Sequence, residues 1–164
     1  MLPPLEELKT ILEQELPGVS VSIEGAWLVV GSKDLLAVGR YLKETERFRL
    51  DYLANVTAID YPPDPAAGGA GRIEMVYHLY SMEHKHGPLP VKVVLPRATP
   101  TVASVTPVWR SAELQEREVY DLYGVTFEGH PDLRRILMWD GFDGHPMRKD
   151  YVVEDQDVLQ ERPQ

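Results

Sequence analysis

Titratable side chains in the last third of the chain form the most conspicuous chemical pattern of the sequence. An aromatic, acidic, glycine, histidine, proline pattern occurs at 127–131 and again at 142–146. A basic pair follows each copy, Arg134-Arg135 the first and Arg148-Lys149 the second. Glycine permits positive φ, and proline pushes the preceding histidine into an extended conformation. The pattern predicts main-chain turns with an aromatic anchor and a charged clamp, which suits a chain crossing the surface of another protein.

The same segment contains side chains that bind divalent metals, so a metal hydrolase is the sharpest enzymatic alternative. The candidate ligands are His130, Asp132, Asp140, Asp143 and His145. No two histidines have the i,i+4 spacing that a helix uses to hold a metal, and both candidate histidines precede a proline. A second histidine pair, His84 and His86, could form a metal clip in a turn, but exposed turn histidines are far more often merely solvated. We therefore expect no metal site.

Glu116 is the other chemically unusual residue, because it interrupts the apolar face of an expected helix. That face is formed by Trp109, Ala112, Val119, Tyr120 and Tyr123. On a wheel advancing about 100° per residue, Glu116 lies near its middle. An unpaired buried carboxylate would protonate, so Glu116 needs a donor, and an arginine fork fits best. The candidate donors are Arg134, Arg135 and Arg148. The pair would lock the tail onto its own helix or join a partner chain; a catalytic acid is the third possibility.

The helix that carries Glu116 also has a charged flank. Glu113, Arg117 and Asp121 follow one another at i,i+4 spacing, which predicts an ion-pair ladder on the surface. Thr106-Pro107 is a typical helix start, Ser111 is an alternative N-cap, and Gly124 is a typical stop.

Composition excludes several classes of function. The chain has 17 basic and 26 acidic side chains and a net charge of −9, which disfavours nucleic acid and bare anionic membranes as partners. It has no cysteine, which removes disulfides, thiol catalysis and cysteine-ligated zinc or iron–sulfur sites. The N-terminal segment has neither a basic nor an apolar signal region, so we expect no signal peptide. The apolar runs are far shorter than the ~20 residues that cross a bilayer.

Hydrophobic periodicity predicts the elements that must position these residues. We expect helices at 3–16, 33–46 (with Ser32 as N-cap) and 106–123, strands at 19–23, 27–30, 50–61, 72–82 and 89–95, and a surface loop at 62–71. This order, α-β-β-α-β-β-β-α, predicts an α+β fold with a mainly antiparallel sheet and helices on one face. We expect residues 1–124 to form this domain and residues 125–164 to form an extended, irregular C-terminal tail.

The tail has more apolar surface than disordered tails have. Its large apolar residues are Leu133, Ile136, Leu137, Met138, Trp139 and Phe142. An irregular segment of this length cannot bury all of them on a small sheet, so the tail should order fully only on a partner protein.

Three segments carry a resemblance to a known family. They are Glu116-Arg117-Glu118-Val119-Tyr120-Asp121-Leu122-Tyr123-Gly124, Gly129-His130-Pro131-Asp132-Leu133-Arg134-Arg135-Ile136-Leu137 and His145-Pro146-Met147-Arg148-Lys149-Asp150-Tyr151. Together they resemble the C-terminal signature of the C-subunit of respiratory complex I, the NADH–quinone oxidoreductase family whose mitochondrial counterpart is the thirty-kilodalton subunit. The family usually has proline after the tyrosine, where this chain has Val152, so the exit from Tyr151 should be less rigid and residues 152–164 less ordered.

The resemblance implies a non-catalytic subunit of the hydrophilic arm of a proton-pumping NADH–quinone oxidoreductase. Its tail would bind the large quinone-site subunit, known in the family as the D-subunit, and flavin mononucleotide (FMN) and the iron–sulfur clusters would belong to neighbouring subunits. The chain would lie on the cytoplasmic face of a bacterial inner membrane, reaching the membrane only through the complex. The signature residues expected at the interface are Glu116, Arg117, Glu118, Asp121, His130, Arg134, Arg135, His145, Arg148, Lys149 and Asp150. An equivalent subunit of a membrane-bound nickel–iron hydrogenase complex is the alternative.

Overall fold

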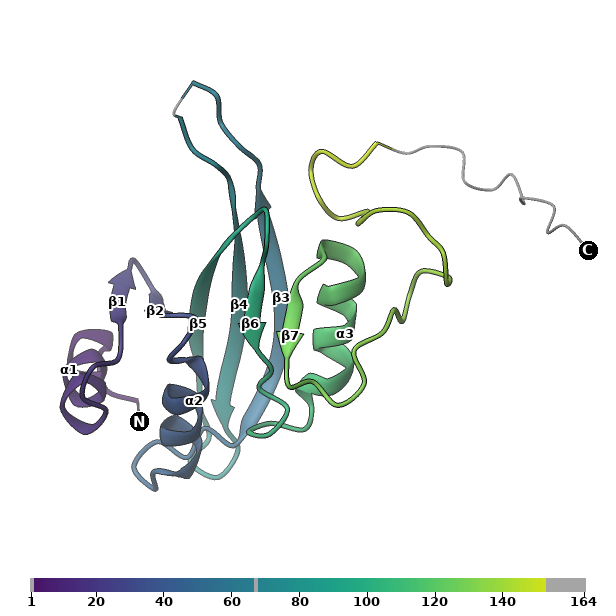
Figure 1. Cartoon of the computed structure of the whole chain (residues 1–164). Helices are drawn as coiled ribbons and strands as arrows, with labels where there is room; N and C mark the ends of the chain where they lie inside the picture. The colour runs from purple at the N-terminus through teal and green to yellow at the C-terminus, as the bar shows by residue number, and fades with distance from the viewer. Residues whose placement is uncertain (1, 67, 153–164) are drawn as a thin grey trace, which may run out of the picture.

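The computed structural model describes residues 2–66 and 68–152 of the 164-residue chain. Ten elements follow one another (Figure 1): α1 (Leu5–Glu15), β1 (Val21–Glu24), β2 (Trp27–Val30), α2 (Leu35–Glu44), β3 (Tyr52–Tyr61), β4 (Arg72–Ser81), β5 (His86–Pro96), β6 (Thr101–Ala103), α3 (Ala112–Tyr123) and β7 (Thr126–Glu128). The α+β class and the mostly antiparallel sheet are confirmed. Within the described residues no helix is both long and apolar enough to cross a membrane.

The main sheet has five strands in the order β1-β2-β5-β4-β3. Its three long strands form a continuous antiparallel meander, in which Tyr77 of β4 pairs with Val56 on one side and Val91 on the other. The exception is the parallel pair β2 and β5, because the chain crosses over through α2 and the β3–β4 hairpin before it returns to β2. Along β3 and the second half of β5, buried and more exposed residues largely alternate with period two, whereas the central strand β4 has five consecutive buried residues.

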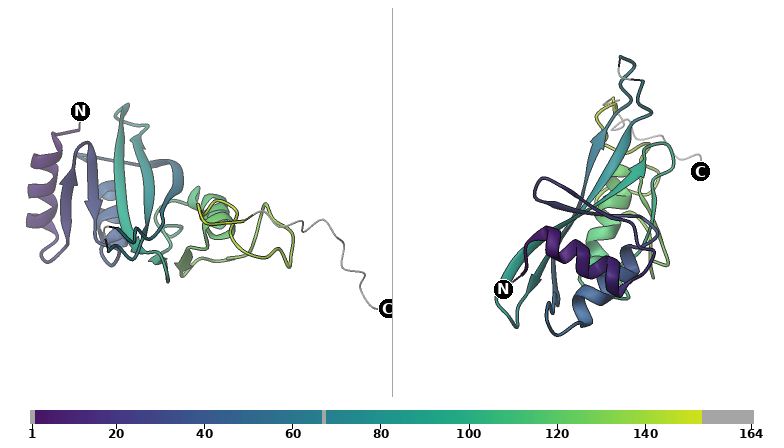
Figure 2. Two further views of the ribbon diagram at one scale, coloured as in Figure 1. Left: turned by 90° about the horizontal axis from the view of Figure 1, so that it is seen from above. Right: turned by 90° about the vertical axis from the view of Figure 1, so that its left-hand side faces the viewer.

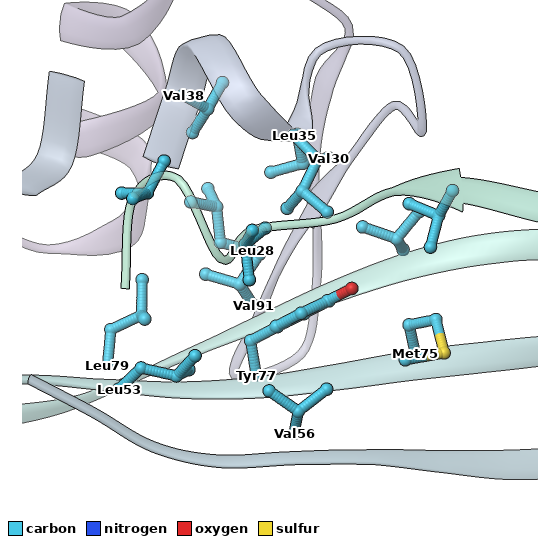
Figure 3. Close-up of a cluster of buried hydrophobic side chains, with 14 of the residues drawn as sticks. Leu28, Val30, Leu35, Val38, Leu53, Val56, Met75, Tyr77, Leu79 and Val91 are labelled. Atoms are coloured by element: carbon cyan, nitrogen blue, oxygen red, sulfur yellow. The ribbon is translucent and has the colours of Figure 1, made fainter. Parts of the chain in front are cut away.

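The core lies between this sheet and α2 (Figure 3). Leu35, Val38 and Leu42 of α2 are buried against sheet residues that include Tyr77 and Val91. Trp109, which lies outside the sheet strands, completes the core. Its side chain is 3% exposed, and its ring nitrogen donates to the Leu50 carbonyl at 2.9 Å. Leu8 and Leu12 of α1 are fully buried, and α1 packs against β1 and β2.

Helix α3 was expected on one face of the sheet with the other helices. It lies instead beside the edge strand β3, at the end of the sheet opposite to α1 (Figure 2). Its residues bond to the free edge of β3. Gln115 Oε1 accepts from the Val56 N–H at 2.7 Å, and the Ser111 hydroxyl donates to the Leu53 carbonyl at 3.1 Å. An open strand edge is prone to pairing with other chains, and α3 blocks this one.

Three details differ from the expected elements: the residue before α2, the strands on either side of α3, and the start of the irregular C-terminal segment. Asp34, not Ser32, precedes α2, and no side chain caps the helix there because the Asp34 carboxylate accepts the Ser20 N–H at 2.9 Å. Strands β6 and β7 were not predicted; they pair in parallel and bring 101–103 beside 126–128. The segment expected to be irregular from residue 125 therefore begins with a strand, and Phe127 in it is buried. Residues 153–164, expected to be less ordered, lie outside the described residues.

Candidate functional site

The residues singled out by the sequence gather around α3 and the segment that follows β7. Of the C-terminal tail expected from residue 125, the first residues form β7, and from here on the tail means its remaining described part, residues 129–152. It leaves β7 at one end of α3 and runs back along the helix to its other end (Figure 1). The tail was expected to order fully only on a partner, but here it is held by hydrogen bonds to its own chain up to Asp150.

The two histidines of the repeated pattern hold the tail to opposite ends of α3. His130 Nε2 donates to the Glu113 carbonyl at 2.9 Å, and its Nδ1 accepts the Asp132 N–H at 3.0 Å, so both ring nitrogens are satisfied in the neutral form. His145 Nδ1 donates to the Asp121 carbonyl at 3.0 Å. Burial lowers the pKa of His145, which favours its neutral form as well. The repeat is therefore a two-point clasp on one helix.

The second half of the clasp supplies donors to the carbonyl end of α3. The last carbonyls of a helix have no intrahelical partner. Here the Met147 N–H donates to the Leu122 carbonyl at 3.1 Å, and Arg148 Nε donates to the Tyr123 carbonyl at 2.7 Å. Gly124 adopts φ 73°, and its N–H bonds to the Tyr120 carbonyl, as a left-handed helix stop does. A Cβ on Gly124 would collide with the His145 ring, so this glycine also makes room for the clasp.

Asp121 organises the middle of the tail. Its Oδ2 accepts three consecutive N–H groups, those of Ile136, Leu137 and Met138, at 3.0, 2.7 and 2.8 Å. Its Oδ1 accepts from Arg135 at 2.6 Å. Burial would raise the pKa of Asp121, but the bonds from Met138, Arg135, Leu137 and Ile136 outweigh it and hold that pKa below its ordinary value.

Arg117 and Arg135 bind the carbonyl groups of the same stretch. Arg117 donates to the carbonyls of Arg134 and Arg135 at 3.1 Å each. Arg135 donates to the carbonyls of Phe142 and Gly144, also at 3.1 Å. The surface ion-pair ladder expected from the i,i+4 spacing is therefore wrong, because Arg117 and Asp121 are 7% and 0% exposed. The tail covers them, and its main-chain groups take their bonds.

Glu116 is fully buried, as expected, but the prediction of an arginine partner is wrong. Its carboxylate accepts from the Ser104 hydroxyl at 2.6 Å and from the Val105 N–H at 2.7 Å, and His130 Nε2 lies 3.9 Å away. The loop between β6 and α3 supplies these donors without a cation. Burial therefore dominates and raises the pKa of Glu116 to about 7, since the two hydrogen bonds offset only part of it.

The end of the tail is fixed near the loop end of the β3–β4 hairpin, where β3 leads into the 62–71 connection. Arg97 bridges two carboxylates, with Asp60 at 2.6 Å and Asp150 at 2.6 Å. The Lys149 N–H donates to Asp60 at 2.8 Å, and the Lys149 ammonium lies over the Tyr61 ring. Sequence reasoning missed Asp60 and Arg97. The signal was present, because Asp60 continues the inward-facing positions of β3 after Val56 and Ala58.

The other sequence candidates lie apart from these clusters. Arg134 pairs with Asp132 at 2.9 Å on the surface, and Glu118 is exposed on α3. The candidate metal ligands His130 and His145 lie at opposite ends of α3 with ring nitrogens bonded to carbonyls. His84 Nε2 likewise bonds to the Glu46 carbonyl at 2.7 Å. Across residues 2–66 and 68–152 no three side chains of metal-binding type converge.

The tail turns large apolar side chains to the solvent while its polar groups bond inward. Four are conspicuous: Ile136, Leu137, Trp139 and Met147, with exposed fractions of 38%, 56%, 52% and 52%. The Trp139 ring packs edge to face with the half-buried Phe142 ring, with 4.8 Å between the two centroids. Exposed apolar side chains concentrated on one ordered segment are typical of a protein interaction site. The arrangement can bind a protein surface.

Comparison with known proteins finds related sequences for most of the chain. Residues 28–157 match the family described as respiratory-chain NADH dehydrogenase, 30 Kd subunit. The NADH-quinone oxidoreductase C-subunit of Moorella thermoacetica is 50% identical over 127 residues, which cover 77% of this chain and 80% of that protein. The C-subunit of Chloroherpeton thalassium is 44% identical over 120 residues, or 73% of this chain and 47% of that longer protein.

Two solved structures share the fold. A trypsin-resistant fragment of Nqo5 is 32% identical, with a TM-score of 0.55 over 77% of this chain and 98% of the fragment. A chain of the membrane-bound sulfane sulfur reductase, an archaeal respiratory membrane complex, has a TM-score of 0.70 over 97% of this chain and 95% of its own. At 23% identity the second likeness is one of fold alone.

Proposed function

The chain belongs to the family of the 30 Kd subunit of respiratory-chain NADH dehydrogenase, and we propose that it is a non-catalytic assembly subunit in the hydrophilic arm of a proton-pumping NADH–quinone oxidoreductase. The observation that carries the proposal is the tail, an ordered segment that displays Leu137, Trp139 and Met147 to the solvent. In a subunit of a larger complex, such a segment serves to bind a neighbour.

The partner in this proposal is the large quinone-site subunit of the same complex. The chain then lies at the cytoplasmic face of a bacterial inner membrane and reaches the membrane only through the complex. The redox groups, FMN and the iron–sulfur clusters, belong to neighbouring subunits. The absence of cysteine supports this division of labour, because iron–sulfur clusters are held mainly by thiolates.

Co-purification of the tagged full-length chain from native membranes tests the proposal. Leu137→Asp places a charge in the exposed apolar set, and we expect it to lose the other subunits of the complex. Leu114→Asp is the matched control, because Leu114 is also 56% exposed but lies on α3 outside the tail. Recovery of the complete complex with Leu137→Asp would show that the tail is not the docking element.

The composition of the recovered complex distinguishes the two candidate assemblies. We expect FMN, iron–sulfur clusters and NADH oxidation. A nickel-containing complex without FMN would instead identify the chain as the equivalent subunit of a hydrogenase-type assembly, the alternative that the resemblance of its C-terminal segments implies.

A further inference from the structure

The stretch of the tail that displays the apolar side chains is fixed from the inside. We call residues 134–147 the docking loop. Its N–H groups at Ile136, Leu137 and Met138 all point to one oxygen of Asp121. Its carbonyls at 134, 135, 142 and 144 accept from Arg117 or Arg135. These bonds hold the irregular backbone of the loop without a partner protein.

The basic side chains of the tail are also engaged within the chain. Arg135 is bonded to Asp121, Arg134 is paired with Asp132, and Arg148 donates to the Tyr123 carbonyl, while Lys149 lies over the Tyr61 ring. The charged clamp expected from the sequence is therefore closed on the chain itself. Beside the exposed charged residues Arg134, Asp140 and Asp143, the loop presents four large apolar side chains to the outside, Ile136, Leu137, Trp139 and Met147.

We infer that Asp121 positions a docking loop that is formed before the partner arrives, and that the partner meets the four large apolar side chains of the loop with an apolar surface. This inference rests on the proposed function for the existence of a partner. Asp121 touches no partner; it is a positioning residue that acts through the backbone of the loop. A preformed loop loses little conformational freedom on binding, which favours affinity.

Hydrogen exchange of the isolated full-length chain tests the positioning role by itself. We expect the amides of Ile136, Leu137 and Met138 to be protected, and Asp121→Asn to abolish most of that protection while the amides of β4 exchange as in the wild type. Arg135→Gln is the second variant, should the first disturb the core, and it should expose the same amides. Fast exchange of the three amides in the wild-type chain would overturn the inference.

Leu137→Asp separates this inference from the proposed function. Its side chain is exposed, so the variant should keep the protected amides and lose binding to the purified quinone-site subunit. Asp121→Asn should lose protection and bind about tenfold more weakly, because the loop must then be ordered on binding. If Leu137→Asp binds normally while the amides stay protected, the proposed function fails and the positioning role stands.

Salt dependence tests the chemistry of the partner surface. Exposed charge pairs weaken as the ionic strength rises, whereas apolar contacts do not. Between about 0.05 and about 0.5 M salt we expect the dissociation constant for the quinone-site subunit to change by less than about threefold. A weakening of about tenfold or more would overturn the apolar assignment. Dimerisation of the chain alone, abolished by Leu137→Asp in sedimentation experiments, would identify a second copy as the occupant and overturn it as well.

Discussion

Replacing Glu116 with glutamine should remove one contribution to the pH dependence of the free energy of unfolding, namely that of the buried Glu116 carboxyl group. Burial raises the pKa of Glu116 to about 7 in the folded chain, from an ordinary value of 4.5. Between these values the folded state keeps a proton that the unfolded chain has released. The free energy of unfolding of the wild type therefore falls as the pH rises through this window, by a total of about 3 kcal/mol, and then changes no further through this group.

Glutamine fits the same site without a charge. Its carbonyl can accept the Val105 N–H, and its amide can donate to the Ser104 hydroxyl oxygen, so both partners of the carboxylate keep a bond. We expect Glu116→Gln and the wild type to be about equally stable at about pH 5, where Glu116 is protonated. At about pH 8 the variant should be more stable by about 3 kcal/mol.

Urea unfolding of both proteins across this pH range measures the difference, in which the titration of all other groups cancels. Glu118→Gln is the matched control, because Glu118 is exposed on the same helix. A difference for Glu116→Gln that is flat, or that favours the wild type at alkaline pH, would refute the reasoning. It would mean that burial does not keep Glu116 protonated in the folded chain.

Two further substitutions test the way in which the tail is held. Gly124→Ala combines a φ of 73° with a collision against His145, so we expect it to lower the free energy of unfolding in urea by more than about 2 kcal/mol. Gly129→Ala has a φ of 79° but open space around its Cβ, so it should lower the same free energy by about 1 kcal/mol. Equal losses would contradict the close approach of His145 to Gly124. Arg97→Gln leaves Asp60 buried without its cation and should lower the free energy of unfolding by about 3 kcal/mol. Arg47→Gln breaks an exposed pair with Glu7 and should leave that free energy unchanged. Comparable effects of the two substitutions would show that Asp60 does not depend on Arg97.

The elements with a clear period could be predicted from the sequence. Strand β2 coincides with the expected 27–30, and Gly124 ends α3 as expected. Strands β6 and β7 could not be predicted, because three residues are too short to show alternation and their pairing joins segments far apart in the chain. The resemblance of the C-terminal segments pointed to the correct family, although it said nothing of how their charged residues are used.

The structure brings many of the expected residues together around α3, but their hydrogen bonds and ion pairs differ from those expected. The expected ladder on α3 failed because spacing along a helix says nothing of what later covers it, and here the tail covers Arg117 and Asp121. The prediction of an arginine partner for Glu116 was wrong for a different reason. Ser104 and the Val105 N–H leave no charge pattern to search for, whereas arginines are easy to find in a sequence. The signature residues thus describe how the tail folds onto α3, and the contact with a partner remains a proposal that the exposed apolar residues support.

The clasp on α3 also has a consequence for biosynthesis. The helix spans 112–123, but the donors for its last two carbonyls come from residues 147 and 148, close to the C-terminal end of the described chain. A ribosome releases the helix well before it releases these donors. A nascent or truncated chain that ends before His145 therefore leaves the carbonyls of Leu122 and Tyr123 to water and the Asp121 carbonyl without its bond from the histidine ring. Completion of this helix thus depends on synthesis of the last signature residues, so a prematurely terminated chain can be distinguished from a finished one by its unprotected last turn.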